Sequence, residues 1–113
     1  MDCLFCKMIN REIEPDIVYE DDHVLAFNDI NLQAPTHVLV IPKKHIATLN
    51  DIQEEDLALV GRLHRTAAKL AGQYGFAEEG YRVVMNCNEN GGQTVFHIHL
   101  HLMGGRQFTW PAG

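Results

Sequence analysis

The chain has 113 residues, the size of one ordinary domain, and we expect residues 1–113 to form a single domain. Its net charge of −6 argues against binding to polymeric nucleic acid, because the surface as a whole repels phosphate backbones. No apolar run is long enough to span a bilayer, and the N-terminus lacks the pattern of a secretory signal. We therefore expect a cytoplasmic protein that does not associate with membranes.

The first half of the chain is expected to hold a short helix and three strands. Residues 3–12 have apolar positions at helical spacing, and Pro15 limits how far this helix can continue. Residues 16–20 and 23–29 are β-branched and aromatic runs separated by two aspartates, a pattern that predicts a hairpin. Residues 37–43 form an apolar run that predicts a buried strand.

One long helix is predicted next, because apolar residues recur every three or four positions. Asp51 and Glu54 have the spacing of a capping box and indicate its start, and Gly75 indicates its end. Two further strands, over residues 81–87 and 94–103, are joined by the turn-rich sequence NENGGQ. The elements together predict an α+β domain built on an antiparallel sheet. The apolar stripe of the long helix is Leu57, Val60, Leu63, Ala67, Leu70 and Tyr74.

The last predicted strand carries three histidines at alternate positions, in the sequence TVFHIHLHLM. Successive side chains of a strand point to opposite faces, so His97, His99 and His101 share one face. Three adjacent polar rings would each need a hydrogen-bond partner in a core, so this face is expected to meet solvent, a partner or a pocket. The opposite face supplies core packing through Phe96, Ile98, Leu100 and Leu102.

Three roles are open for these imidazoles: a solvated face, a metal site, or nucleophilic catalysis at phosphorus. A zinc ion could take two of the nitrogens, but the outer two Cα atoms lie ~13 Å apart, so one ring would be left over. Catalysis would use all three, because neutral imidazole is a nucleophile and its neighbours can donate hydrogen bonds to phosphoryl oxygens. Nearby, Gly91 and Gly92 would allow close backbone approach to a ligand, and Gln93 and Thr94 would add donors.

The sequence HIHLHLM resembles the His-x-His-x-His-x-x signature of the histidine triad (HIT) superfamily of nucleotide hydrolases and transferases. The stretches YEDDHVLAFNDINLQAPTHVLVIPKKHI and NENGGQTVFHIHLHLMGGRQFTWPAG resemble its Hint branch, whose members are purine nucleoside phosphoramidases. The resemblance spans nearly the whole chain. It implies a HIT-like antiparallel five-stranded sheet with one long and one short helix, and a homodimer whose two sheets join into a continuous ten-stranded sheet.

The resemblance also implies the roles of the catalytic residues. His99 matches the nucleophile that forms a covalent nucleotidyl-histidine, which water later hydrolyses. His97 is expected to orient this site and His101 to contact the phosphate oxygens. His37 is similar to the family's fourth active-site histidine, and Thr94 stands beside the leaving group, where the Hint pattern usually has serine.

Substrate-binding residues are implied in the same way, and the implied ligand is a purine nucleoside monophosphate derivative. Asp29 matches the carboxylate that holds the ribose hydroxyls, although a turn role before INLQAP remains open for it. Trp110 would reach toward the partner's site in the homodimer, or else pack on its own domain. The apolar slot around the base would be formed by Phe5, Met8, Phe27 and Ile30, for which core packing is the alternative, and the polar phosphate side by Asn86 and Gln93.

The pair Cys3-x-x-Cys6 has a spacing that commonly holds zinc. Some HIT proteins combine such a pair with two histidines, which here would be His45 and His97. No cofactor is required for catalysis in this reading, so the zinc would be structural. The alternative is that the cysteines are two small buried residues on a short helix.

The sequence therefore predicts a hydrolase that cleaves the P–N bond of nucleoside 5′-phosphoramidates, such as adenosine phosphoramidate or adducts of the lysyl-AMP type. Two alternatives are a dinucleoside polyphosphate hydrolase of the Fhit type and a non-catalytic zinc-binding or adaptor module. The ending GGRQFTWPAG argues against the first of these.

Overall fold

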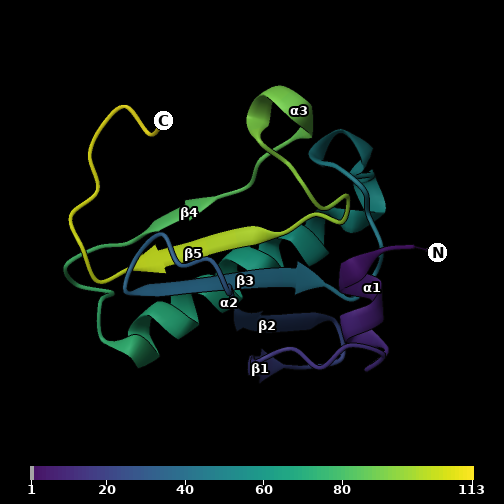
Figure 1. Ribbon diagram of the computed structural model, residues 1–113, viewed down its shortest axis with the longest axis horizontal. Coiled ribbons are helices and arrows are strands. Elements are labelled where there is room, and N and C mark those ends of the chain that lie inside the picture. The colour runs from purple at the N-terminus through teal and green to yellow at the C-terminus, as the bar shows by residue number, and fades with distance from the viewer. Residues whose placement is uncertain (1) are drawn as a thin grey trace.

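The computed structural model describes residues 2–113, so Met1 of the expected 1–113 domain lies outside the described residues. Its centre is a five-stranded sheet in the order β1-β2-β3-β5-β4, with every neighbouring pair antiparallel (Figure 1). This confirms the predicted α+β fold with a five-stranded antiparallel sheet. The strands are β1 (Ile17–Glu20), β2 (Val24–Asn28), β3 (Thr36–Pro42), β4 (Arg82–Val84) and β5 (Leu100–Gly104).

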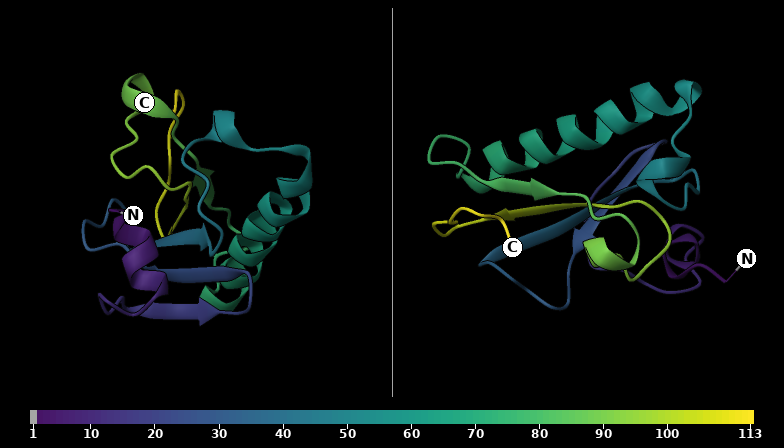
Figure 2. Two further views of the ribbon diagram at one scale, coloured as in Figure 1. Left: turned by 90° about the vertical axis from the view of Figure 1, so that its right-hand side faces the viewer. Right: turned by 90° about the horizontal axis from the view of Figure 1, so that it is seen from above.

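Helices cover both faces of this sheet. The long helix α2 (Leu57–Tyr74) lies across one face, and the short helix α1 (Leu4–Ile9) lies on the other (Figure 2). Alternate residues of β2 and β3 pack into two separate apolar clusters because their side chains alternate between faces. Both strands are therefore almost fully buried. The cluster under α2 includes Val24, Ala26, Val38 and Val40, and the cluster with α1 includes Leu25, Phe27, Leu39 and Ile41.

The long helix ends where predicted but starts later. Gly75 adopts the left-handed conformation (φ 88°) and closes the helix, as expected for a glycine C-cap. The predicted start at Asp51 is wrong because Asp51 belongs to a capping box with Thr48, which begins a single 3₁₀ turn over Leu49–Asp51. Ile52 then takes an extended conformation, so the chain must begin a new helical turn, and α2 starts only at Leu57.

The histidine-bearing strand is shorter than the predicted 94–103. Residues 94–99 pair with no strand: the Ile98 N–H donates instead to the Ile46 carbonyl (2.8 Å), so this segment leaves the sheet's ladder. Side chains nevertheless keep the period of two from Ile98 onward, because Ile98, Leu100 and Leu102 are all buried under α2. Phe96 does not share this core face, since it is 48% exposed.

The strand predicted over 81–87 is also shorter, because only Arg82–Val84 pairs with β5. The turn-rich segment after it contains one helical turn, α3 (Asn88–Gly91), which ends at Gly92 in the left-handed conformation (φ 84°). Within residues 2–113 there is no helix with the length and apolar character needed to cross a membrane.

Gly104→Ala is expected to lower the free energy of unfolding by about 1–3 kcal/mol, the usual cost of overpacking a core. A Cβ at Gly104 would lie 2.5–2.6 Å from three ring atoms of Phe76, which is 8% exposed and therefore has little room to move. Urea unfolding followed by circular dichroism measures the effect. The matched control is Gly61→Ala within α2, where nothing lies within 4 Å of the added Cβ. This control should stabilise by about 1 kcal/mol through helix propensity, and a Gly104 variant as stable as wild type would contradict the packing argument.

Candidate active site

Four histidines from two parts of the chain meet on the α1 face of the sheet. His37 lies on β3 and His101 on β5, and these strands pair directly. His97 and His99 lie in the segment just before β5. Three of the rings are almost inaccessible, with His97 0%, His99 7% and His37 2% exposed. The imidazole face thus forms a partly enclosed site and is not a solvated surface.

His99 is held with one ring nitrogen free. Its Nδ1–H donates to the carbonyl of His97 (2.9 Å), which assigns the lone pair of the neutral ring to Nε2. Nε2 has no hydrogen-bond partner among the described residues. Because every fully buried side-chain nitrogen of these residues has a partner, Nε2 must be accessible to solvent. The edge-on ring of Phe5, with centroids 5.1 Å apart, fixes the plane of the imidazole. His99 can therefore present a lone pair to a ligand.

His37 and His101 form a chain of hydrogen bonds with a defined direction. The backbone N–H of Gln33 donates to Nδ1 of His37 (3.1 Å), so the neutral ring of His37 carries its proton on Nε2. This Nε2–H donates to Nδ1 of His101 (2.9 Å), which leaves the proton of His101 on its own Nε2. His101 is thereby set as a hydrogen-bond donor next to His99, with ring centroids 5.0 Å apart.

Burial keeps these rings neutral. It lowers the pKa of His99 and of His37, an effect partly offset at His37 by the charge of Asp29. It lowers the pKa of His97 and of His101 to about 4, assisted at His101 by the neighbouring imidazoles. Near neutral pH the site therefore combines an unprotonated nucleophile with neutral donors.

Stability is expected to fall as the pH drops from 6.5 toward 4. The pKa of His101 is about 4 in the folded chain against an ordinary 6.5, so protonation favours the unfolded chain. Its contribution is complete above pH 6.5 and is lost as the pH falls toward 4. In His101→Asn, whose side-chain oxygen can still accept from His37, urea unfolding should show a shallower decline over this range. An unchanged slope would contradict the assignment.

The loop between β2 and β3 carries Asp29, whose two carboxylate oxygens have different neighbours. Oδ1 accepts from the N–H of Asn31 (3.0 Å), which is the turn role left open by the sequence. Oδ2 lies 3.4 Å from Nε2 of His37. Asp29, Ile30 and His37 border a hollow of about 550 Å³, which extends to Tyr74 at the end of α2 and is not lined by His99 or His101.

The residues predicted to surround the base are only partly brought together. Phe5 and Phe27 are 3% exposed and contact each other edge to face, with centroids 5.5 Å apart. Met8 packs against the same cluster. Ile30 lies apart from them at the edge of the Asp29 cavity and is fully exposed, at 102%. Three of the four thus form an apolar floor beside His99, and the fourth lies on a separate loop.

The remaining predicted site residues differ in their exposure and in whether their polar groups are already hydrogen-bonded. Both amide hydrogens of Gln93 are used within the protein, by the carbonyls of Ala47 (2.8 Å) and Val95 (3.1 Å), so this side chain fastens its own loop. Thr94 is exposed and Asn86 half-buried, and neither side chain has a hydrogen-bond partner among the described residues. Trp110 is 85% exposed, so the alternative that it packs on its own domain is wrong.

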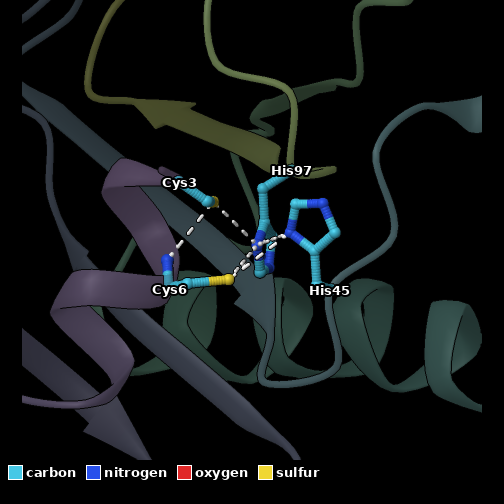
Figure 3. Close-up of side chains that lie close together, drawn as sticks. All are labelled: Cys3, Cys6, His45 and His97. Atoms are coloured by element: carbon cyan, nitrogen blue, oxygen red, sulfur yellow. Dashed lines mark hydrogen bonds between the residues drawn. The ribbon is translucent and has the colours of Figure 1, made fainter. Parts of the chain in front are cut away.

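A second cluster joins Cys3 and Cys6 of α1 to His45 and His97, and all four side chains point toward one another (Figure 3). Nδ1 of His97 lies 3.5 Å from Sγ of Cys3, 3.6 Å from Sγ of Cys6 and 3.2 Å from Nδ1 of His45. Sγ of Cys6 lies 3.4 Å from Nδ1 of His45. Ligands around a tetrahedral zinc with ordinary bond lengths are separated by about 3.3–3.8 Å, so the four atoms fit such an ion.

The protonation pattern of the cluster also fits a metal. Nε2 of His97 donates to the carbonyl of Pro42 (2.7 Å), which directs the lone pair of Nδ1 toward the two sulfurs and is the usual outer contact of a metal-bound histidine. Burial and the neighbouring Cys3 raise the pKa of Cys6 to about 11, so its thiolate would need a nearby positive charge.

A further group of possible ligands, formed by Asp29, His37 and His101, does not fit a metal in the same way. The Gln33 N–H occupies Nδ1 of His37, so Nε2 carries the proton and has no lone pair to offer. A metal there would have to break two of the hydrogen bonds described above. His37 and His101 belong instead to the chain of hydrogen bonds that starts at the Gln33 N–H. Gln33 and Pro42 could not be predicted as site residues, because both act through backbone groups that any residue type could supply.

The antiparallel sheet, which carries clustered neutral histidines beside an apolar floor, defines the class of protein as a histidine triad hydrolase. The chain belongs to the histidine triad family: a family model described as the HIT domain matches residues 10–108. The Hint branch is supported by a 56% identity over 103 residues to the purine nucleoside phosphoramidase of Escherichia coli strain K12, covering 91% of this chain and 87% of that protein.

Solved structures agree with this membership. A HIT family hydrolase from Legionella pneumophila Philadelphia 1 is 56% identical and superimposes with a TM-score of 0.97, covering 99% of this chain and all of the other. A histidine triad protein from Clostridium difficile is 48% identical with a TM-score of 0.92, covering 96% and 95% of the two chains. The predicted membership is therefore confirmed, and the protein is an enzyme of this hydrolase family.

Proposed function

We propose that the protein hydrolyses the P–N bond of nucleoside 5′-phosphoramidates, such as adenosine phosphoramidate or lysyl-AMP adducts, through a covalent intermediate on His99. The observation that carries this proposal is the free Nε2 lone pair of His99, fixed by the bond from its Nδ1–H to the His97 carbonyl. The name of the E. coli relative supports the same substrate class.

The reaction has two steps. Nε2 of His99 attacks phosphorus and forms a P–N bond to the ring, while the P–N bond to the amine breaks and the amine leaves with a proton taken from solvent water. Water then attacks the same phosphorus, releases the nucleoside monophosphate and restores His99. The Nε2–H of His101 donates to a phosphoryl oxygen in both transition states. Thr94, exposed at the end of the loop before His99, supplies a hydroxyl near the leaving group.

The nucleoside half of the substrate is assigned to the loop and the apolar floor. Asp29 holds the ribose hydroxyls with Oδ2, while Phe5, Met8, Phe27 and Ile30 surround a purine base and Asn86 and Gln93 lie on the phosphate side. The assignment of Asp29 is supported by its Oδ2, which lies 3.4 Å from Nε2 of His37, and that of the apolar residues by the edge-to-face contact of Phe5 with His99. A homodimer would add Trp110 to the partner's site, for which the 85% exposure of this ring leaves room. A cytoplasmic location fits the three cysteines, which form no disulfide in residues 2–113.

The cysteine–histidine cluster is assigned to a structural zinc held by Cys3, Cys6, His45 and His97. The interatomic distances and the Pro42 contact support it. When bound, the ion supplies positive charge that stabilises the two thiolates and fastens α1 to the sheet. It has no part in the steps at phosphorus, for which His99 has its own lone pair.

Intact-protein mass spectrometry tests the proposal after rapid quenching with denaturant at alkaline pH, where a P–N bond to imidazole survives. With adenosine phosphoramidate, the wild-type chain should gain the mass of one adenosine monophosphate minus water, and His99→Ala should gain nothing. A dinucleoside polyphosphate hydrolase would instead form this adduct faster from a dinucleoside substrate. A zinc-binding or adaptor module would never form it, and either outcome would overturn the proposal.

A further inference from the structure

The C-terminal tail contacts the β2–β3 loop directly behind the active site. Gly105 has a φ of +93°, and a Cβ there would lie 3.1 Å from Cβ of Pro35, so the tail turns closely against this loop. Next along the chain, Nε of Arg106 donates to the carbonyl of Gln33 (3.1 Å). The tail therefore holds the loop at two adjacent points.

Gln33 sets the protonation of His37 from the Nδ1 side, together with Asp29, whose Oδ2 lies 3.4 Å from Nε2 on the other side of the ring. The backbone N–H of Gln33 donates to Nδ1 of His37 at 3.1 Å, while its carbonyl accepts from Arg106. Both backbone groups of one exposed loop residue are thus occupied, one facing inward and one facing the tail. The side chain of Gln33 makes only a long contact to the carbonyl of Asn31 (3.4 Å), so it does little to fix the loop. Arg106 supplies that restraint.

Arg106 is itself held in place by the tail. Its guanidinium lies over the ring of Phe108, 4.1 Å from the centroid, and Nη1 donates to the carbonyl of Gln107 (3.1 Å). Arg82 of β4 lies over the same ring at 5.1 Å and donates to the carbonyl of Thr109 (2.9 Å). Only Arg106 reaches Gln33, so the two arginines share one aromatic ring but differ in their contact with the active-site loop.

We propose that Arg106 is a positioning residue for the His37–His101 pair, acting through the Gln33 backbone to keep the donor hydrogen of His101 directed at the substrate phosphate. The proposal rests on the proposed function for its kinetic consequence. Its structural part, the direction of the hydrogen-bond chain from Gln33 through His37 to His101, does not depend on the substrate.

Loss of Arg106 would allow this chain to reverse. If the Gln33 N–H turns away, His37 can carry its proton on Nδ1, and its Nε2 then becomes an acceptor. His101 would donate to it from Nδ1, which leaves a lone pair on Nε2 of His101 facing the phosphoryl oxygens. The Nε2 lone pair of His101 would then repel the phosphoryl oxygens, on which negative charge develops in the transition state. The rate of the chemical step should therefore fall more than the affinity for the substrate.

Long-range ¹⁵N–¹H correlation spectra of the imidazoles test the structural part, because they distinguish a protonated from an unprotonated ring nitrogen. Wild type should show His37 protonated on Nε2 alone, whereas Arg106→Ala should show a mixture of both tautomers. The matched control is Arg82→Ala, which removes the other arginine from Phe108 without touching Gln33. It should leave the His37 tautomer as in wild type. A pure Nε2–H form of His37 in Arg106→Ala would overturn the proposal.

Kinetics test the functional part. Arg106→Ala should lower kcat by about tenfold, the effect of one orienting hydrogen bond, with a smaller change in KM. In a His37→Ala background the same substitution should change kcat by less than about twofold, because the residue through which it acts is gone. A full tenfold loss in that background would refute the route through His37. If wild type showed no phosphoramidase activity, the proposed function would fail, while the tautomer measurement would still decide the role of Arg106.

Discussion

Replacement of His99 by alanine is expected to lower kcat/KM for adenosine phosphoramidate by at least about 10⁴-fold, as loss of a covalent nucleophile does elsewhere. The reason is that no other ring of the site offers a free lone pair. Nδ1 of His37 accepts from Gln33 and Nδ1 of His101 accepts from His37, while His97 directs its lone pair at the cysteines. Steady-state release of adenosine monophosphate, measured by chromatography, gives the ratio.

A matched control comes from the long helix. His64 is exposed on α2, where its ring contacts only the carbonyl of Val60 in the same helix (3.1 Å), so His64→Ala should retain wild-type turnover. Thermal unfolding of both variants should show that the fold persists. Turnover in His99→Ala within about tenfold of wild type would mean that this residue is not the nucleophile.

Replacement of Cys6, one of the four ligands of the proposed zinc, is expected to produce the largest loss of stability. If free zinc exceeds its dissociation constant about a thousandfold, the ion contributes about 4 kcal/mol to folding. For a domain of this size, Cys6→Ser should then lower Tm by at least about 10 °C. Elemental analysis of protein purified without added metal should find stoichiometric zinc in wild type and little in the variant. Differential scanning calorimetry measures the shift in Tm.

Cys87 provides the comparison for this experiment. It is a free thiol between β4 and α3 and takes no part in the four-residue cluster, so Cys87→Ser should keep both the zinc and the wild-type Tm. If wild-type protein contained no zinc and a chelator left its Tm unchanged, the zinc assignment would be wrong. The two N-terminal cysteines would then have a packing role alone.

Much of the fold could be predicted because local patterns determined it. The continuous β-branched, aromatic and apolar runs over residues 23–29 and 37–43 located β2 and β3, and the left-handed Gly75 ended α2 where expected. The start of α2 could not be predicted, since Asp51 fits two overlapping capping boxes and only the extended Ile52 decides between them. The length of β5 was overestimated because alternating burial continues through Ile98, where ladder pairing has already stopped.

The candidate site shows a similar division. The spacing of the three alternating histidines and of the Cys3-x-x-Cys6 pair singled out these residues, whereas His37 and His45 were selected only through the family resemblance. Which nitrogen of each ring carries a proton depends on the backbone groups of Gln33, His97 and Pro42, and any residue type could have supplied them. Reactivity in this protein therefore depends on main-chain geometry as much as on the imidazoles themselves.

Helix α1 has only six residues, and a helix of that length has almost no stability alone in water. Its position beside His99 therefore comes from tertiary contacts: Phe5 packs in the apolar cluster under the helix, and Cys3 both caps the first turn and contacts His97. A homologue that dispenses with the two thiols would need bulkier apolar side chains at positions 3 and 6 to anchor the same turn. Bulkier apolar side chains at positions 3 and 6 of this chain should keep the enzyme folded and active without metal. Alanine at both positions should instead leave the ring of Phe5 without a fixed position beside His99.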